Sequence, residues 1–260
     1  MKSRILVNDG QHRRAAIAEA LKEQPRLGDE TISVVLFVDA GLERSQQWFA
    51  DLNKHAVRPT RSISVLYDRR DPMSQLSREL VCQVPIFGNG FTELEKTSVS
   101  NRSTKIFTLN AIYQSTRALL SRNRHESLKP ADKELAVTYW TKLSELIPEW
   151  RMVIQKQISP AELRQRYIHV HGVVLHALGI VGRTLIQQSQ SWQHEIAKIE
   201  NINWERSNTI WQGRSIVRGK ISKDNKSVTL TANVIKMALG LVLSKDELLL
   251  EHRLTEHSGK

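Results

Sequence analysis

The sequence predicts an α/β unit at the start of the chain, followed by a mostly helical region. Over residues 4–83, short β-branched segments alternate with helix-forming segments, and this alternation is typical of an α/β fold. From residue 108 onward, apolar residues recur at helical spacing instead. A chain of 260 residues can form one large domain or two small ones. We therefore expect an α/β domain over residues 1–107 and a helical region over 108–260.

The α/β part is expected to contain strands at residues 4–7, 31–38 and 61–67. The segment 31–38 (TISVVLFV) is apolar on both faces, which predicts a central strand. Helices are expected over the alanine-rich residues 11–22 and over residues 42–55. A third helix is expected from Pro72 to Cys82, because Asp71 can act as its N-cap and proline suits the first helical position.

The second part is expected to be helical, with two polar loops. Lys129-Pro130 and Ser159-Pro160 are typical helix starts, and residues 173–185 are apolar nearly all round, which predicts a buried central helix. The remaining helices are expected to begin near Thr108, to break at Pro148, and to cover 228–243 and 245–254. Residues 121–130 and the basic stretch 205–227 are expected to be loops.

Charge indicates a polyanionic partner. The net charge of +11 favours nucleic acid, although a basic surface can also simply aid solubility. The longest apolar run, residues 173–182, is shorter than the roughly 18 residues that span a bilayer, and no signal peptide is evident. The single cysteine, Cys82, excludes an intrachain disulfide and a cysteine-based zinc site, and we expect it to be buried. We expect a cytoplasmic protein without a membrane partner.

One motif lies where the first strand gives way to a helix: Asp9, Gly10, Gln11, His12, Arg13 and Arg14. The first backbone N–H groups of a helix lack partners within it, and the helix dipole adds positive charge there. Gly10 would let an anion approach, and the two arginines would donate to a phosphate. The alternative is an Asp N-cap followed by an exposed basic turn.

These residues resemble a known family. The run DGQHRRAAI is similar to the signature of the DGQHR-domain proteins of the DndB type, which accompany phosphorothioate modification of bacterial DNA. Residues 47–55 (QWFADLNKH) resemble the F-x-D-L-N-x-x-A stretch of the same family. Residues 211–214 and 235–240 also resemble it, so the likeness spans most of the chain.

The resemblance implies a ParB/sulfiredoxin-like fold for residues 1–107, in which the DGQHR segment cradles nucleotide phosphates. Family members carry strands upstream of this segment, which we expect this chain to lack. The resemblance also places Asn53 in the nucleotide site and makes Asp51 a candidate catalytic residue or magnesium ligand. If 42–55 is a helix, positions 51 and 53 do not share a face, and the alternative is a capped helix end.

Basic residues outside the motif are candidates for DNA contact. They fall into a group around the third predicted strand and a group in the basic loop: Arg58, Arg61, Arg69, Arg70, Arg214, Arg218 and Lys220. Trp204 and Trp211 accompany the loop, either for stacking on bases or as core residues. The spacing of His169, His171 and His176 does not suit a metal on one helix face, so we expect packing roles.

Three functions follow from the resemblance. The first is a DNA-binding repressor of the modification genes, with duplex DNA and other phosphorothioation proteins as partners. The second is a nucleoside triphosphatase that uses Mg²⁺ and acts as a sensor in phosphorothioate-based defence; no Walker A sequence is present. The third is a non-catalytic partner of the modification enzymes. The oligomeric state is left open.

Overall fold

The structure is a computed structural model that describes residues 7, 10–36, 41–54, 59–123 and 125–258. It divides the chain into two compact units, residues 1–58 and 59–260. Among the described residues, none of the helices has the length and apolar character needed to cross a membrane.

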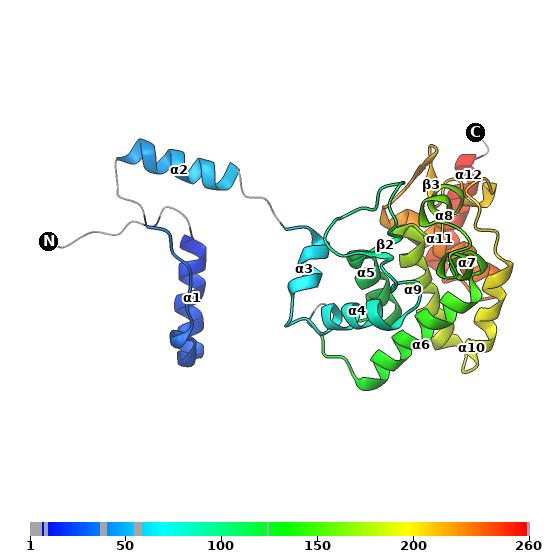
Figure 1. Cartoon of the computed structure of the whole chain (residues 1–260), viewed down its shortest axis with the longest axis horizontal. Helices are drawn as coiled ribbons and strands as arrows, with labels where there is room; N and C mark the ends of the chain where they lie inside the picture. Colours follow the sequence, from blue (N-terminus) through cyan, green and yellow to red (C-terminus); the bar gives the residue numbers. More distant parts are fainter. Residues whose placement is uncertain (1–6, 8–9, 37–40, 55–58, 124, 259–260) are drawn as a thin grey trace. The chain divides into compact units, whose positions relative to one another are not determined.

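The first unit contains two helices and a short 3₁₀ turn: α1 Gln11–Glu23, η1 Pro25–Asp29 and α2 Leu42–Lys54 (Figure 1). None of the residues in this unit whose exposure the structure describes is buried. Helices were predicted at both positions, and both predictions are confirmed. The central strand predicted over 31–38 is wrong in its described part: residues 31–36 form no strand, and Val34, Val35 and Leu36 are exposed. The strand predicted at 4–7 lies outside the described residues apart from Val7.

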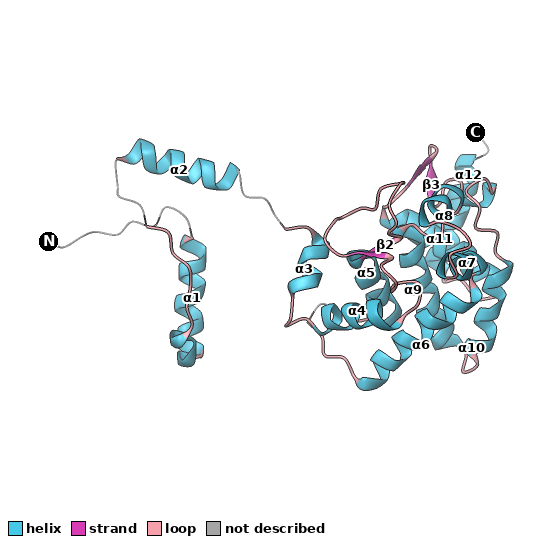
Figure 2. Ribbon diagram, viewed as in Figure 1, coloured by secondary structure: helices cyan, strands magenta, loops and turns pink. Residues whose placement is uncertain are grey.

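The second unit is a helical assembly with two small sheets (Figure 2). Its helices are α3 Arg61–Tyr67, α4 Pro72–Gln83, α5 Leu109–Leu120, α6 Pro130–Leu146, α7 Pro148–Ile154, α8 Pro160–Arg166, α9 Gly172–Gln188, α10 Trp192–Glu195, α11 Asn225–Leu239 and α12 Lys245–Ser258, with 3₁₀ turns η2 Ile196–Asn201 and η3 Thr209–Trp211. Parallel strands β1 Thr92–Glu93 and β2 Phe107–Thr108 form one sheet, and antiparallel strands β3 Ile216–Val217 and β4 Lys220–Ile221 form the other.

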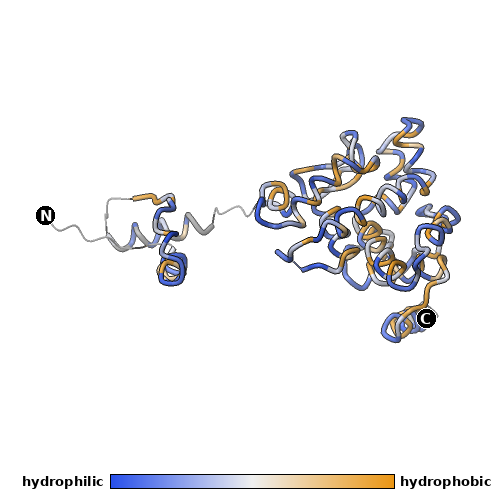
Figure 3. Tube along the Cα trace, turned by 90° about the horizontal axis from the view of Figure 1, so that it is seen from below, coloured by the Kyte–Doolittle hydropathy of each residue, from blue (hydrophilic) through white to orange (hydrophobic). Residues whose placement is uncertain are grey.

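Helix α9 lies at the centre of the core, as predicted. It packs along α5 and α11, and nine of its residues are buried. Ala111, Ser115 and Leu119 of α5 lie against Gly172, Gly179 and Gly182 of α9 in the same order, so the two helices run parallel. Hydrophobic and hydrophilic positions alternate along the helices of this unit (Figure 3), which lets each helix bury one face.

The predicted helix starts are confirmed where a capping residue marks them. Thr108 accepts a hydrogen bond from Ala111 N, Asp71 from Met73 N and Ser159 from Glu162 N. The helical region is also interrupted at Pro148, as predicted: α6 ends at Leu146 and α7 begins at Pro148. Proline cannot continue a helix because it has no backbone N–H to donate.

Two local predictions are wrong. Residues Arg61–Tyr67 form helix α3 and not a strand, because the Thr60 side chain caps its N-terminus by accepting from Ile63 N at 3.1 Å. One face of this helix is buried and contains Ser62 and Val65. Cys82 is exposed and not buried, since it lies on the outer side of the last turn of α4.

The fold consists mainly of helices with a few short strands, which is consistent with the predicted α/β class in coarse terms. The division into compact units falls after residue 58, whereas the sequence predicts a family-domain boundary after residue 107. That boundary stays a prediction.

Candidate functional sites

The DGQHR motif lies at a helix N-terminus. Gly10 is the N-cap of α1 in a left-handed conformation with φ of 97°, which an L-residue rarely adopts, and Arg14 N donates to Gly10 O at 2.8 Å. The Gln11 side chain donates to Val7 O at 3.1 Å. The helix start that the motif requires is therefore present, although Asp9 lies outside the described residues.

Arg13 folds back over this helix end. A Cβ built on Gly10 would lie 3.8 Å from both Nε and Nη2 of Arg13, so the guanidinium lies beside the N-cap. Gln11, His12, Arg13 and Arg14 are all exposed. Exposed cationic side chains thus lie in the first turn of a helix, where backbone N–H groups lack partners within the helix, and such a helix start can bind an anion.

The second motif lies in α2, which continues to Lys54. Asp51 is exposed and accepts from Gln47 Nε2 at 2.7 Å. Asn53 lies two positions further along the same helix, and its side chain lies outside the described part of the structure. The described part of the chain holds no group of three or more metal-ligating side chains.

The basic residues around α3 are exposed but separated. Arg61 begins the helix, and Arg69 and Arg70 lie in the turn that follows it. A seven-residue helix is about 10 Å long, so Arg61 lies one helix length from the other two. Arg58 lies outside the described residues.

The basic loop forms a β-hairpin. Val217 pairs with Lys220, and the two residues between them, Arg218 and Gly219, have φ of 51° and 73°. Positive φ at both central residues is the signature of a type I′ turn, the turn that matches strand twist in two-residue hairpins. Arg218 and Lys220 are both exposed at the tip. The sequence indicated a basic loop but not this hairpin.

Arg214 lies at the base of the same segment and already has a partner. Its guanidinium forms an ion pair of 2.6 Å with Glu251 of α12, and both side chains are largely buried. Trp204 and Trp211 are buried and stacked at 5.5 Å, which answers the question left open by the sequence: both are core residues. The exposed cations of this segment are therefore the candidates for phosphate contact, and Arg214 fits a packing role better.

The three histidines have packing roles, as predicted. His169 is fully buried, accepts from Trp150 Nε1 at 3.0 Å and lies 3.3 Å from a Glu149 oxygen. Burial lowers the pKa of His176, and the charge of Arg117 lowers it further. Burial lowers the pKa of His171 to about 3, assisted by the charges of Arg164, Arg206 and His169.

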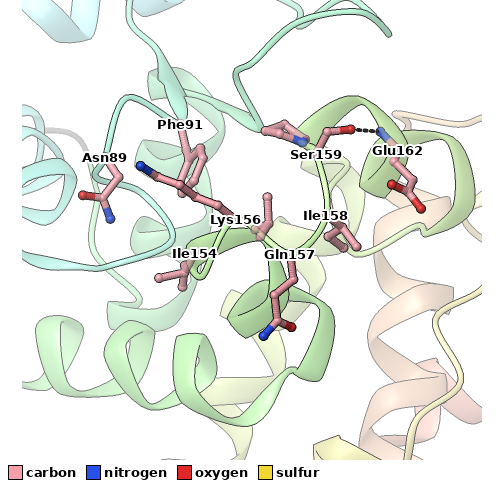
Figure 4. A pocket seen from close by; sticks show the side chains of 10 residues that line it. Asn89, Phe91, Ile154, Lys156, Gln157, Ile158, Ser159 and Glu162 are labelled. Atoms are coloured by element: carbon pink, nitrogen blue, oxygen red, sulfur yellow. Dashed lines mark hydrogen bonds between the residues drawn. The ribbon is translucent and has the colours of Figure 1, made fainter.

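A pocket of about 550 Å³ lies where α7 leads into α8 (Figure 4). Its lining combines residues 89 and 91 with residues 153–154, 156–160 and 162. Ser159 lies at one side of the pocket. It is the N-cap of α8, and its side chain accepts from Glu162 N at 3.1 Å. Lys156 and Glu162 are its only charged lining residues, so it has no cluster of catalytic groups, and it holds none of the predicted site residues.

The family is decided by one comparison. A family model described as DndB, DNA-sulfur modification-associated, matches residues 1–242. The chain belongs to the DndB family. The match extends across both compact units and includes the DGQHR segment, α2 and the β3–β4 hairpin. No curated protein and no solved structure gives a significant match. Membership of the DndB family associates this chain with DNA sulfur modification.

Proposed function

We propose that this DndB-family protein is a DNA-binding regulator of DNA sulfur modification that represses transcription of the modification genes. The observation that carries the proposal is the β3–β4 hairpin, which presents Arg218 and Lys220 at an exposed tip. A two-stranded ribbon fits a groove of duplex DNA, and cations at its tip neutralise phosphates.

The hairpin is anchored to the core and so needs little ordering on binding. Ile216 is only 3% exposed, and Trp211, just before it in the chain, is fully buried. Ser222 N donates to Ser215 O at 2.9 Å below the strands. A preformed element loses less conformational entropy when it binds, which favours affinity.

Charge supports the same partner. The net charge of +11 attracts polyanions, and Lys223 and Lys226, which follow the hairpin, are also exposed. The proposal includes Arg58, Arg61, Arg69 and Arg70 as further phosphate contacts. It also includes a ParB/sulfiredoxin-like arrangement for residues 1–107, with a phosphate or nucleotide held at residues 9–14.

The test is a filter-binding titration on duplex DNA that carries the promoter of the modification genes, at two salt concentrations. We expect Arg218→Ala combined with Lys220→Ala to weaken binding roughly ten- to a hundred-fold. The slope of log affinity against log salt should fall by about 2, since each lost phosphate contact removes about 0.9.

A matched control removes the same charge elsewhere. Arg151 and Arg183 are exposed residues of α7 and α9, and their double alanine variant also loses two positive charges. We expect it to retain most of the affinity. If both double variants weaken binding equally, only net charge matters and the hairpin is not the interface. If the parent protein binds no duplex, the role of non-catalytic partner to the modification enzymes gains support.

A second function, nucleoside triphosphate hydrolysis, is favoured by the arrangement at α1. The left-handed N-cap Gly10 and the guanidinium of Arg13 beside it provide donors for a phosphate chain. In this proposal Arg13 and Arg14 hold the phosphates, and Asp51 positions Mg²⁺ or water.

A further inference from the structure

Helix α12 covers three polar side chains of the second unit. Arg214, at the base of the β3–β4 hairpin, forms an ion pair of 2.6 Å with Glu251. Lys236 of α11 is only 4% exposed and pairs with Glu247 at 2.6 Å. Asn233 of α11 is fully buried, and its Nδ2 donates to Glu251 Oε1 at 2.9 Å. Two cations and an amide donor therefore face two carboxylates of α12.

The two carboxylates lie one helical turn apart. Glu247 and Glu251 are four residues apart on α12, so both project from the same face. Burial raises the pKa of Glu247, but hydrogen bonds from Lys236 and from Ser244 outweigh it and hold the pKa below its ordinary value. Glu247 is therefore ionised at neutral pH. The covered face of α12 thus presents carboxylates in a row, as a nucleic-acid strand presents its phosphates.

Polar contacts, more than apolar ones, hold α12 in place. None of its described residues belongs to the hydrophobic core of the unit, and Leu248 and Leu249 are 53% and 54% exposed. Leu254 lies against Gly213, next to Arg214. Apolar burial is what usually fixes a helix on a protein, whereas a buried ion pair loses in desolvation much of what it gains in attraction. A ligand that satisfies the same cations can therefore displace α12.

The covered cations continue the cationic surface of the hairpin. Arg214 lies four residues before Arg218 of the tip, and its Nη1 donates to Leu230 O of α11 at 3.4 Å. Lys236 follows six residues further along α11, about 9 Å from Leu230 along the helix axis. Positive charge thus extends from the exposed tip through the hairpin base to α11. The family match includes this whole surface and ends at residue 242, before α12.

We infer that α12 is an autoinhibitory cover, whose carboxylates occupy a phosphate-binding surface for nucleic acid formed by Arg214, Asn233 and Lys236. The inference rests on the proposed function, because duplex DNA bound at the hairpin tip is the polyanion that displaces the helix. With α12 docked, Arg214 has a packing role. With α12 displaced, Arg214 and Lys236 add phosphate contacts to those of Arg218 and Lys220. The affinity for DNA is therefore set by how firmly α12 is docked.

The test is Glu247→Gln combined with Glu251→Gln in the full chain, in filter binding to the promoter duplex at two salt concentrations. Glutamine at position 247 can still accept from Ser244 N, so the start of α12 is kept. We expect roughly ten-fold tighter binding and a salt slope steeper by about 2, since each new phosphate contact adds about 0.9. Lys236→Gln, added to this double variant, should remove about half of the extra slope and most of the gain in affinity.

Asp246→Asn combined with Glu256→Gln is the matched control. Both residues are exposed on the same helix, and the pair changes the net charge by the same amount. This variant should bind the duplex within about two-fold of the parent. An equal gain in both double variants would mean that net charge alone sets the affinity, and would overturn the inference.

Hydrogen exchange of the unmodified protein gives a second measurement. The amides of α12 should exchange faster when duplex DNA is bound, and unchanged or slower exchange would contradict the cover. If the parent binds duplex through the hairpin and the glutamate variant binds no more tightly, the cover is refuted and the proposed function stands. If neither the parent nor the glutamate variant binds duplex at low salt, the proposed function fails and the inference fails with it.

Discussion

Asp71 shows how one side chain can join distant segments of this chain. It is 1% exposed and accepts hydrogen bonds from Ser74 Oγ at 2.8 Å and from the backbone N of Met73 and His125 at 3.4 and 3.1 Å. Burial raises the pKa of Asp71, but the hydrogen bonds from Ser74, Tyr113 and these backbone groups outweigh it and lower the pKa below its ordinary value. The ionised carboxylate thus caps α4 and also holds the 121–128 loop.

We expect Asp71→Asn to lower the free energy of unfolding at pH 7 by about 1–3 kcal/mol, since a buried charge-assisted acceptor is lost. A lowered pKa in the folded state contributes stability above the unfolded pKa, which is lost as pH falls through the folded value. The difference between parent and variant should therefore be full at pH 7 and shrink below about pH 4. Urea unfolding at several pH values measures it.

Asp246→Asn is the matched control, because Asp246 is exposed in the first turn of α12. It should change stability by less than about 0.5 kcal/mol. A difference between parent and Asp71→Asn that stays constant from pH 7 to pH 3 would show that the carboxylate charge has no part in the cap.

At the scale of single residues, the sequence predicts which residues cap helices better than it predicts the surroundings of a buried charged side chain. Asp71 could be assigned because the capping rule needs only its immediate neighbours in the chain. The setting of Arg164 could not, because its contact with Ile106 O and the parallel course of α5 and α9 arise only in the folded chain. Cys82 was misjudged for the same reason: its exposure depends on which face of α4 the core covers.

At the scale of elements, the close approach of α5 and α9 depends on two glycines. A Cβ built on Gly179 would overlap the backbone carbonyl of Ser115, and one on Gly182 would lie 2.4 Å from Tyr139 Cζ of α6 and 2.6 Å from Leu119 Cδ1 of α5. Real side-chain atoms do not approach so closely, so these positions fix the distance between the helices. The sequence predicted that α9 is buried but could not show which helix would lie against its glycines.

We expect Gly179→Ala to lower the free energy of unfolding by about 3 kcal/mol or more, at the upper end of overpacking costs, because backbone and not a flexible side chain is displaced. Chemical denaturation measures it. Gly172→Ala in the same helix is the control, since its Cβ would lie 3.5 Å from Ala111 Cβ, an ordinary contact. Equal stability of Gly179→Ala and the parent would mean that the helices can separate without cost.

Secondary structure was predictable where a cap and a periodic pattern agree, as at α4, α5 and α8. The prediction failed at α3 because apolar and polar residues alternate in RSISVLY, as they do in a strand. The residue that favours a helix, the N-cap Thr60, lies just before this segment. The prediction also failed over 31–36, where an apolar run predicted a buried strand but the residues are exposed. A strand needs a partner, and pairing is not encoded locally.

At the scale of the whole molecule, the nucleotide-binding and DNA-binding regions of the proposed function belong to different compact units. The DGQHR segment and α2 lie in residues 1–58, and the hairpin lies in residues 59–260. The family match covers residues of both units. Nucleotide and DNA binding should therefore be separable by mutation.

We expect Arg13→Ala to abolish nucleoside triphosphate binding or hydrolysis while it changes promoter affinity by less than about two-fold, since the guanidinium beside Gly10 is lost and the hairpin is untouched. Phosphate release and filter binding on the same samples measure both. The hairpin double variant should show the reverse pattern. Loss of both activities in either variant would contradict the assignment of the two functions to separate units.

The turn at Arg218 has a further consequence. An arginine at φ of 51° occupies a conformation that glycine and asparagine tolerate at lower cost, by about 1–2 kcal/mol for an ordinary residue. Asparagine at this position should therefore make the protein harder to unfold while it binds promoter DNA less well. Such opposed effects of one substitution would show a trade-off at position 218, where the protein is less stable because it keeps a cation at the tip of the β3–β4 hairpin.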